Sequence, residues 1–123
     1  MQTADFVTTI FDGHSNPNKV TVAFTMALSA VKKGHSATVI LMGEAVQLAK
    51  PDAANDIDIG QPFEPAATLI KNYLELGGQI AICKSCMVHN GISEEEVVPS
   101  YQIITSPDVI DLLMASKGSL QLT

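Results

Sequence analysis

Short apolar runs alternate with longer stretches of helical periodicity along this chain. The short runs are rich in β-branched and aromatic residues and are bounded by turn-forming residues, which is typical of strands. They predict strands at 6–11, 37–42, 79–83, 101–105 and 119–122. Between them, apolar residues recur at helical spacing and predict helices at 17–33, 65–76 and 107–115. Shorter helices are expected at 44–50 and directly after Cys83, and the acidic, proline-bounded stretch 51–62 indicates one long loop.

The first long helix carries signals at both ends. Asn16 and Pro17 suit the cap and the first turn, while Lys32-Lys33-Gly34 places cations and a glycine where a helix ends. No charged residue occurs from Val20 to Val31, and Met26 lies off the face that would cover a sheet. A helix that is uncharged all round is usually buried on both sides. We therefore expect a second copy of the chain or a partner subunit to cover the side that carries Met26.

Strands that alternate with helices predict a single α/β domain over residues 1–123. The expected architecture is a three-layer α/β/α arrangement with a mostly parallel sheet of about five strands. Such sheets bind their ligands at the carboxyl ends of the strands. Asp12-Gly13-His14, Gly43-Glu44 and Cys83 each follow or end a predicted strand. These segments are expected to meet at one site, although each turn residue alone also suits an ordinary turn.

Composition and charge narrow the classes of partner. The 123 residues are 46% hydrophobic, and thirteen acidic residues against seven basic ones give a net charge of −6. The longest basic cluster is Lys32-Lys33, so the basic stripe of a nucleic-acid-binding protein is missing from the sequence. The first residues do not resemble a signal peptide, and the apolar run at 37–42 is far shorter than a membrane span. The sequence therefore predicts a cytoplasmic protein without a membrane or nucleic-acid partner.

Two cysteines carry the candidate chemistry. Cys83 and Cys86 are the only cysteines and form the motif Cys83-Lys84-Ser85-Cys86 where a predicted strand passes into a helix. Backbone N–H groups and the positive end of the helix dipole at such a junction favour thiolate over thiol. In a cytoplasmic protein this spacing is more often catalytic, redox-active or metal-binding than a structural disulfide.

The stretch from Gly78 to Cys86, with Gly91-Ile92 after it, resembles the cysteine segment of the DsrE/DsrF-like sulfur-relay family. The segments 34–39 and 110–123 are also similar to that family. The resemblance implies a small oligomeric α/β protein that accepts a sulfane sulfur on one cysteine and passes it to a partner protein. Cys83, eight residues before Gly91, occupies the sulfur-carrying position, and Cys86 occupies a position that is cysteine in some members. A homo-oligomer, with a trimer as the first expectation, and no cofactor are implied.

Sulfur chemistry agrees with that role. A thiolate that attacks a sulfane sulfur, supplied by a donor protein or a small sulfur compound, becomes a persulfide, which is a reversible state. Cys86 can resolve a persulfide on Cys83 to a disulfide and release sulfide, or it can simply pack inward. His14, in the loop after the first strand, is the histidine that we expect to face the thiol and to pair with it or steer a donor.

Two alternatives remain open from the sequence. The first is a dithiol–disulfide oxidoreductase, because its active sites use the same cysteine spacing. The second is a zinc or copper site formed by Cys83, Cys86 and His89, which would need a fourth ligand such as Asp12 or His14. The order of preference is sulfur relay, then redox, then metal.

Overall fold

A single parallel sheet forms the centre of the protein in the computed structural model, which describes residues 2–123. The five strands lie in the order β4-β3-β2-β1-β5, and every neighbouring pair is parallel. The strands are β1 (Phe6–Ile10), β2 (Ala37–Leu41), β3 (Gln79–Cys83), β4 (Gln102–Ile104) and β5 (Gly118–Leu122). The helices are α1 (Pro17–Lys32), η1 (Gly43–Ala49), α2 (Ala66–Glu75), α3 (Lys84–His89), η2 (Glu94–Glu96) and α4 (Ser106–Ala115).

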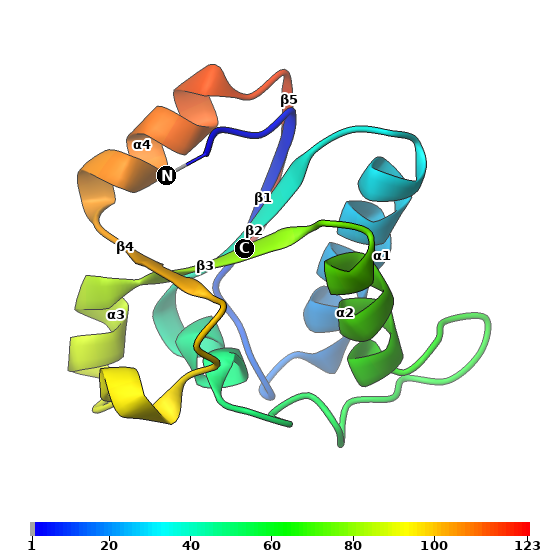
Figure 1. Ribbon diagram of the computed structural model, residues 1–123. Helices are drawn as coiled ribbons and strands as arrows, with labels where there is room; N and C mark the ends of the chain where they lie inside the picture. Colours follow the sequence, from blue (N-terminus) through cyan, green and yellow to red (C-terminus); the bar gives the residue numbers. More distant parts are fainter. Residues whose placement is uncertain (1) are drawn as a thin grey trace.

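Helices cover both faces of the sheet, so the expected three-layer α/β/α fold is confirmed. Figure 1 shows α1 and α2 on one face, α4 on the other, and α3 beyond the end of β3. The larger core cluster joins the α1 and α2 face to residues such as Val39 and Ile82. A smaller cluster packs Val109 and Leu112 of α4 against the opposite face, which includes Ile40. Cover on both faces explains why the central strand β2 is buried along its whole length.

Local signals start the helices where the sequence indicated. The Asn16 side chain caps α1 by accepting a hydrogen bond from the Lys19 backbone N–H at 3.2 Å, and Pro17 occupies the first turn. Helix α4 begins with a capping box, in which Thr105 and Asp108 satisfy each other's backbone and side-chain groups. These contacts satisfy N–H groups that have no partner inside the helix.

Tyr73 connects α2 to the sheet. Its ring is fully buried, meets Phe24 of α1 edge-on at 6.0 Å, and places its hydroxyl between β2 and β3. The hydroxyl lies 3.0 Å from the Ala37 carbonyl oxygen and 2.6 Å from that of Gln79, and accepts from the Gln79 backbone N–H at 3.1 Å. Burial raises the pKa of this hydroxyl, so it stays a neutral donor.

The predicted elements are confirmed, with three differences. The sheet is entirely parallel rather than mostly parallel. The short helix after β2 is a 3-10 helix, and the short η2 was not expected. Helix α1 packs against α2 of the same chain. The side of α1 that carries Val22, Met26 and Ala30 remains partly exposed, with Met26 at 45% exposure, so its cover by a second copy or a partner subunit stays a prediction.

None of the helices between residues 2 and 123 combines the length and the apolar composition that crossing a membrane requires.

Candidate functional site

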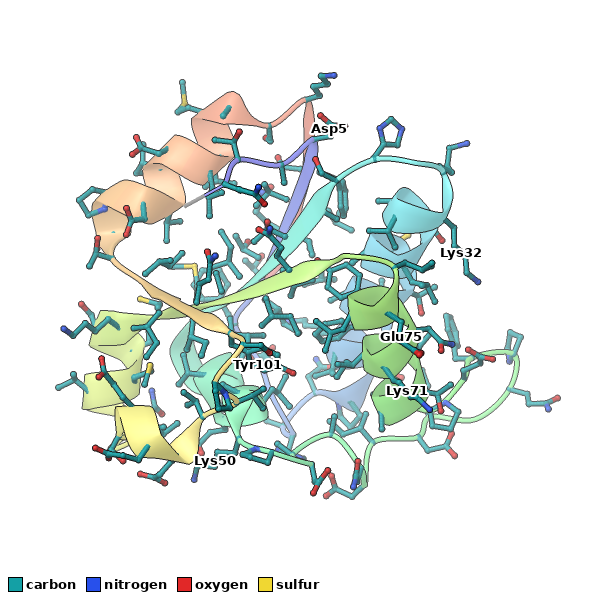
Figure 2. All side chains as sticks on the ribbon, viewed as in Figure 1. Asp5, Lys32, Lys50, Lys71, Glu75 and Tyr101 are labelled. Carbon is teal, nitrogen blue, oxygen red and sulfur yellow. The ribbon has the colours of Figure 1, made fainter. Side chains whose placement is uncertain are left out.

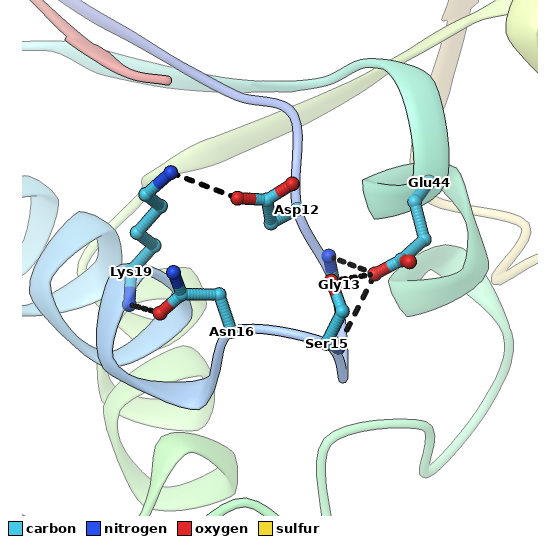
Figure 3. A network of polar contacts seen from close by, with 6 residues as sticks. All are labelled: Asp12, Gly13, Ser15, Asn16, Lys19 and Glu44. Atoms are coloured by element: carbon cyan, nitrogen blue, oxygen red, sulfur yellow. Dashed lines mark hydrogen bonds and ion pairs between the residues drawn. The ribbon is translucent and has the colours of Figure 1, made fainter.

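Glu44 joins the loop after β1 to the turn after β2. One carboxylate oxygen, Oε1, accepts hydrogen bonds from the Gly13 N–H at 2.7 Å, the Ser15 hydroxyl at 2.7 Å and the Ser15 N–H at 3.3 Å (Figure 3). These bonds, led by the one from the Ser15 hydroxyl, hold the pKa of the Glu44 carboxyl below its usual range. Two of the three segments that were expected to converge therefore do so.

The third segment, which contains Cys83 and α3, is joined to the turn after β2 by a hydrogen bond between Asn90 and Gly43. The Asn90 side-chain amide donates to the Cys86 carbonyl oxygen at 2.8 Å and to the Gly43 carbonyl oxygen at 3.4 Å, which links the end of α3 to the start of η1. Gly43 has φ +53°, and a Cβ there would lie 3.2 Å from the Phe11 carbonyl oxygen. Because both the conformation and the close approach favour glycine, a larger residue would displace this junction. The ends of β1, β2 and β3 therefore form one connected site.

Cys83 lies at the junction of β3 and α3. It is the last residue of the strand and the N-cap of the helix, and its side chain makes no capping hydrogen bond. Alternation along the strand places it on the same face as Ala81, the face covered by α4, beside Ile104 of β4. Cys83 is only 5% exposed. The sequence predicted its place at the strand end, but not that it would be buried.

Cys86 is the more accessible of the two free thiols. It is half-buried and packs against the larger core cluster, so the inward-packing interpretation describes part of its environment. Burial raises the pKa of the Cys86 thiol, the nearby Gly43 backbone N–H lowers it, and the Cys83 thiol beside it raises it. The Cys83 thiol is therefore close enough to influence the ionisation of Cys86.

His14 contacts the loop that follows η1. Its Nε2 lies 2.7 Å from the Ala53 carbonyl oxygen and 3.1 Å from a carboxylate oxygen of Asp56. Together with Ser15 and Glu44 it lines a cavity of about 470 Å³, whose lining includes neither cysteine. The ring thus faces Ala53 and Asp56 rather than the thiol that it was expected to face. A role for His14 in sulfur transfer stays a prediction.

The described residues do not form the metal site that the spacing Cys83, Cys86 and His89 suggested. Within residues 2–123, no three side chains of His, Cys, Asp or Glu lie close enough together to hold a metal ion. His89 is exposed at the end of α3, where it does not converge with the two cysteines. A spacing of three residues along the chain is therefore not sufficient to bring three ligands around one metal ion.

A family model decides the relationship of this chain to known proteins. It is the model of the DsrE/DsrF-like family, and it matches residues 5–121, nearly the whole chain and both cysteines. The chain belongs to the DsrE/DsrF-like family. The resemblance seen in the cysteine segment is therefore confirmed at the level of the family.

The individual proteins that resemble this chain are more distant from it in sequence. The Methanocaldococcus jannaschii protein named Uncharacterized protein MJ0989 is 28% identical over 94 residues, which cover 76% of this chain and 78% of that protein. The crystal structure of the ychN protein from E. coli aligns with a TM-score of 0.74 at 14% identity, and covers 98% of this chain and 99% of that one. Protein BT1422 of unknown function from Bacteroides thetaiotaomicron aligns with a TM-score of 0.62 at 22% identity, over 95% and 94% of the two chains. These two structures share the fold of this chain.

Glu44 and Asn90 could not be recognised as site residues from the sequence alone. Glu44 reads as part of a turn, and its role depends on β1 and β2 being neighbours in the sheet. Asn90 reads as the end of a short helix, and its bond to Gly43 bridges 47 positions of sequence. The strand-end rule indicated the segments but could not identify the side chains that join them.

Proposed function

We propose that this protein is a sulfur carrier that accepts a sulfane sulfur as a persulfide on Cys83 and passes it to a partner protein. The observation that carries the proposal is the pair of neighbouring free thiols at the junction of β3 and α3, within the segment that the family model matches. The fold supports it, because the ends of three adjacent strands are joined around this junction.

The transfer consists of two thiol exchange steps. The Cys83 thiolate attacks the outer sulfur of a sulfane donor, a new S–S bond forms at Cys83, and the bond that held this sulfur in the donor breaks with its electron pair leaving on the donor thiolate. In the second step an acceptor thiolate attacks the outer sulfur of the persulfide, and Cys83 leaves as a thiolate. No net oxidation or reduction of the protein occurs.

In this proposal Cys86 either receives the persulfide from Cys83 or resolves it to a disulfide. It is more exposed than Cys83 and lies beside it. Attack of Cys86 on the outer sulfur moves the persulfide to Cys86 and regenerates the Cys83 thiol. Attack on the inner sulfur instead gives a Cys83–Cys86 disulfide and releases sulfide. The raised pKa of Cys86 lowers its thiolate fraction near neutral pH, which slows both reactions.

A protein partner suits the surface of the site. The exposed apolar side chains Phe11 and Val88 flank it, at 38% and 72% exposure, and Lys84 and Ser85 between the cysteines are also exposed. Such a surface offers apolar contact area to a docking partner close to the thiols. We further propose a homo-oligomer, with a trimer as the first expectation, that works in the cytoplasm without a cofactor.

Intact mass after treatment with polysulfide tests the proposal. The Cys86→Ser variant should gain the mass of one or more sulfur atoms and lose it again on reduction, whereas Cys83→Ser should gain none. Both variants keep one thiol in the same motif, so each serves as the matched control for the other. Loading of Cys83→Ser to the wild-type level would contradict the assignment.

The contact between the two thiols also favours a second candidate, a dithiol–disulfide oxidoreductase. Equilibration of the wild-type protein with glutathione buffers distinguishes the two functions. An oxidoreductase forms its intramolecular disulfide reversibly within the range of cellular buffers and reduces protein disulfides with turnover. A sulfur carrier does not catalyse the reduction of protein disulfides and takes up sulfane sulfur instead.

A further inference from the structure

A cleft of about 350 Å³ lies beside α2, at the edge of the larger core cluster. Its walls come from three segments that are distant in sequence: the loop from Lys50 to Asn55, one side of α2, and the segment from Val98 to Tyr101. This volume is at the lower end of the range of about 300–1,000 Å³ that is typical of small-molecule sites. Neither cysteine lines the cleft, which is therefore separate from the proposed sulfur site.

Helix α2 presents a second apolar stripe to this cleft. Ala66, Leu69 and Tyr73 form its buried face. Ala67, Ile70 and Leu74, which recur at the same helical spacing, line the cleft instead. This second stripe packs partly against the larger core cluster, through Ile70 and Leu74, and remains partly exposed at the cleft. Its exposed part offers an apolar surface for a ligand.

The cleft is locally positive in an acidic protein. Its lining contains Lys50, Lys71 and one acidic residue, Asp52, which gives a local charge of +1 against −6 for the whole chain. No ion pair of the Lys71 ammonium group is found within residues 2–123. The Lys50 ammonium lies 3.7 Å from a Glu96 carboxylate oxygen, a long contact between exposed groups that contributes little. The Lys71 ammonium is therefore free to meet an anion, whereas the Lys50 ammonium is held by this weak pair.

Tyr101 adds a hydrogen-bond donor and an aromatic wall. Its side chain is half-buried, and its hydroxyl has no hydrogen-bond partner among the described residues. Burial raises the pKa of this hydroxyl, so it remains protonated and can donate. In Figure 2, Tyr101, Lys50 and Lys71 come from three different segments of the chain, all of which line the cleft.

We propose that this cleft binds a small organic carboxylate with an apolar body. The body would lie against Ile70, Leu74 and Val98, and the carboxylate would meet the Lys71 ammonium and the Tyr101 hydroxyl at the rim. Apolar walls with a few convergent polar groups are the usual construction of such sites. A multiply charged anion is less well suited, because Asp52 stands on the same lining and the protein as a whole is negative.

Titration of the isotope-labelled full chain, followed by NMR, tests this site. Benzoate and hexanoate are the probes, and benzamide and hexanamide are their uncharged counterparts. We expect saturable shifts of the backbone amides of Ala54, Ile70, Lys71 and Tyr101 with at least one of the two acids. The matching amide should bind about fivefold more weakly, because an exposed charge contact is worth about 1 kcal/mol. Cys83→Ser should bind the acid as the wild type does, since the cleft contains no cysteine.

Variants of single lysines complete the test. Lys71→Met should weaken binding of the acid about fivefold, whereas Lys32→Met, at the end of α1 and outside this lining, should leave it unchanged. Tyr101→Phe should also weaken it, by a smaller factor. Absence of saturable shifts with both acids, equal binding of acid and amide, or equal effects of Lys71→Met and Lys32→Met would each overturn the proposal.

Discussion

At the scale of single residues, Glu44 is the side chain whose charge matters most for the geometry of the site. One of its oxygens accepts three hydrogen bonds from Gly13 and Ser15, and this arrangement favours the ionised carboxylate. A carboxyl group whose pKa is lowered in the folded protein stabilises it above the usual pKa of glutamate. That contribution is lost as the pH falls through the lowered value.

We therefore expect Glu44→Gln to lower the midpoint of thermal unfolding by a few degrees at neutral pH, because a charged acceptor makes stronger hydrogen bonds than an amide. The difference from the wild type should shrink as the pH falls below the usual range of glutamate. Glu75→Gln, an exposed glutamate on α2, is the matched control and should have little effect. A Glu44→Gln difference that is constant across this pH range would contradict the role of the charge.

Tyr73→Phe should destabilise the protein by about 1–3 kcal/mol, because it leaves buried polar groups of the Ala37 and Gln79 backbone without a partner. Tyr101→Phe is the natural control, since these are the two tyrosines of the chain and the Tyr101 hydroxyl has no partner among the described residues. It should stay within about 0.5 kcal/mol of the wild type. Urea unfolding measures both values, and equal stabilities would contradict the role of the Tyr73 hydroxyl.

At the scale of elements, most boundaries follow from local chemistry that a sequence displays. The cap at Asn16, the proline at the start of α1 and the apolar runs of the strands predicted the elements closely. The helix η2 was missed because three exposed glutamates carry no apolar periodicity, and a capping box at Ser93 holds the turn instead. Such short helices depend on a local exchange of side-chain hydrogen bonds.

The turn between α2 and β3 illustrates a constraint that local patterns do not reveal. A Cβ at Gly78 would collide with the Tyr73 ring, which cannot move because it is fully buried. Gly78→Ala should therefore cost about 1–3 kcal/mol of stability in urea unfolding. Gly118→Ala is the control, because nothing lies within 4 Å of a Cβ there, and it should be nearly neutral. Comparable losses in the two variants would show that backbone flexibility, rather than the ring, is responsible.

The candidate site could be predicted only in part, because contacts between segments that are distant in sequence decide its details. The strand-end rule correctly brought together the segments around Gly13, Gly43 and Cys83. It could not predict that Cys83 would be more buried than Cys86, because this depends on which sheet face Cys83 occupies and on the position of α4. The cleft beside α2 was also missed, since its walls come from three segments that meet only in the folded chain.

At the scale of the whole molecule, exposed apolar side chains indicate where copies of the chain can meet. Met26 is 45% exposed on the α1 side and borders a cavity of about 340 Å³, while Ile110 and Met114 are 57% and 81% exposed on α4. The monomer therefore has apolar surface on both outer layers. Association of two copies through one of these layers would remove its apolar surface from water.

Light scattering behind size exclusion tests the expected oligomer, for which a monomer of 13.0 kDa at micromolar concentration is the contrary result. Met26→Lys should shift an assembly towards monomer without changing thermal stability of the subunit, because a charge in an apolar interface is costly. Met114→Lys, an exposed methionine on the opposite layer, is the matched control. Dissociation by Met114→Lys alone would place the interface on α4 and contradict the role of α1.

The central claim, that Cys83 carries the sulfur, can be tested in the wild-type protein because Lys84 lies between the two cysteines. After loading with polysulfide and alkylation, cleavage by trypsin places Cys83 in the peptide 72–84 and Cys86 in the peptide 85–117. Peptide mass spectrometry should find the additional sulfur, in its alkylated form and removable by reductant before alkylation, on the peptide 72–84. Additional sulfur found on the peptide 85–117 alone would contradict the account.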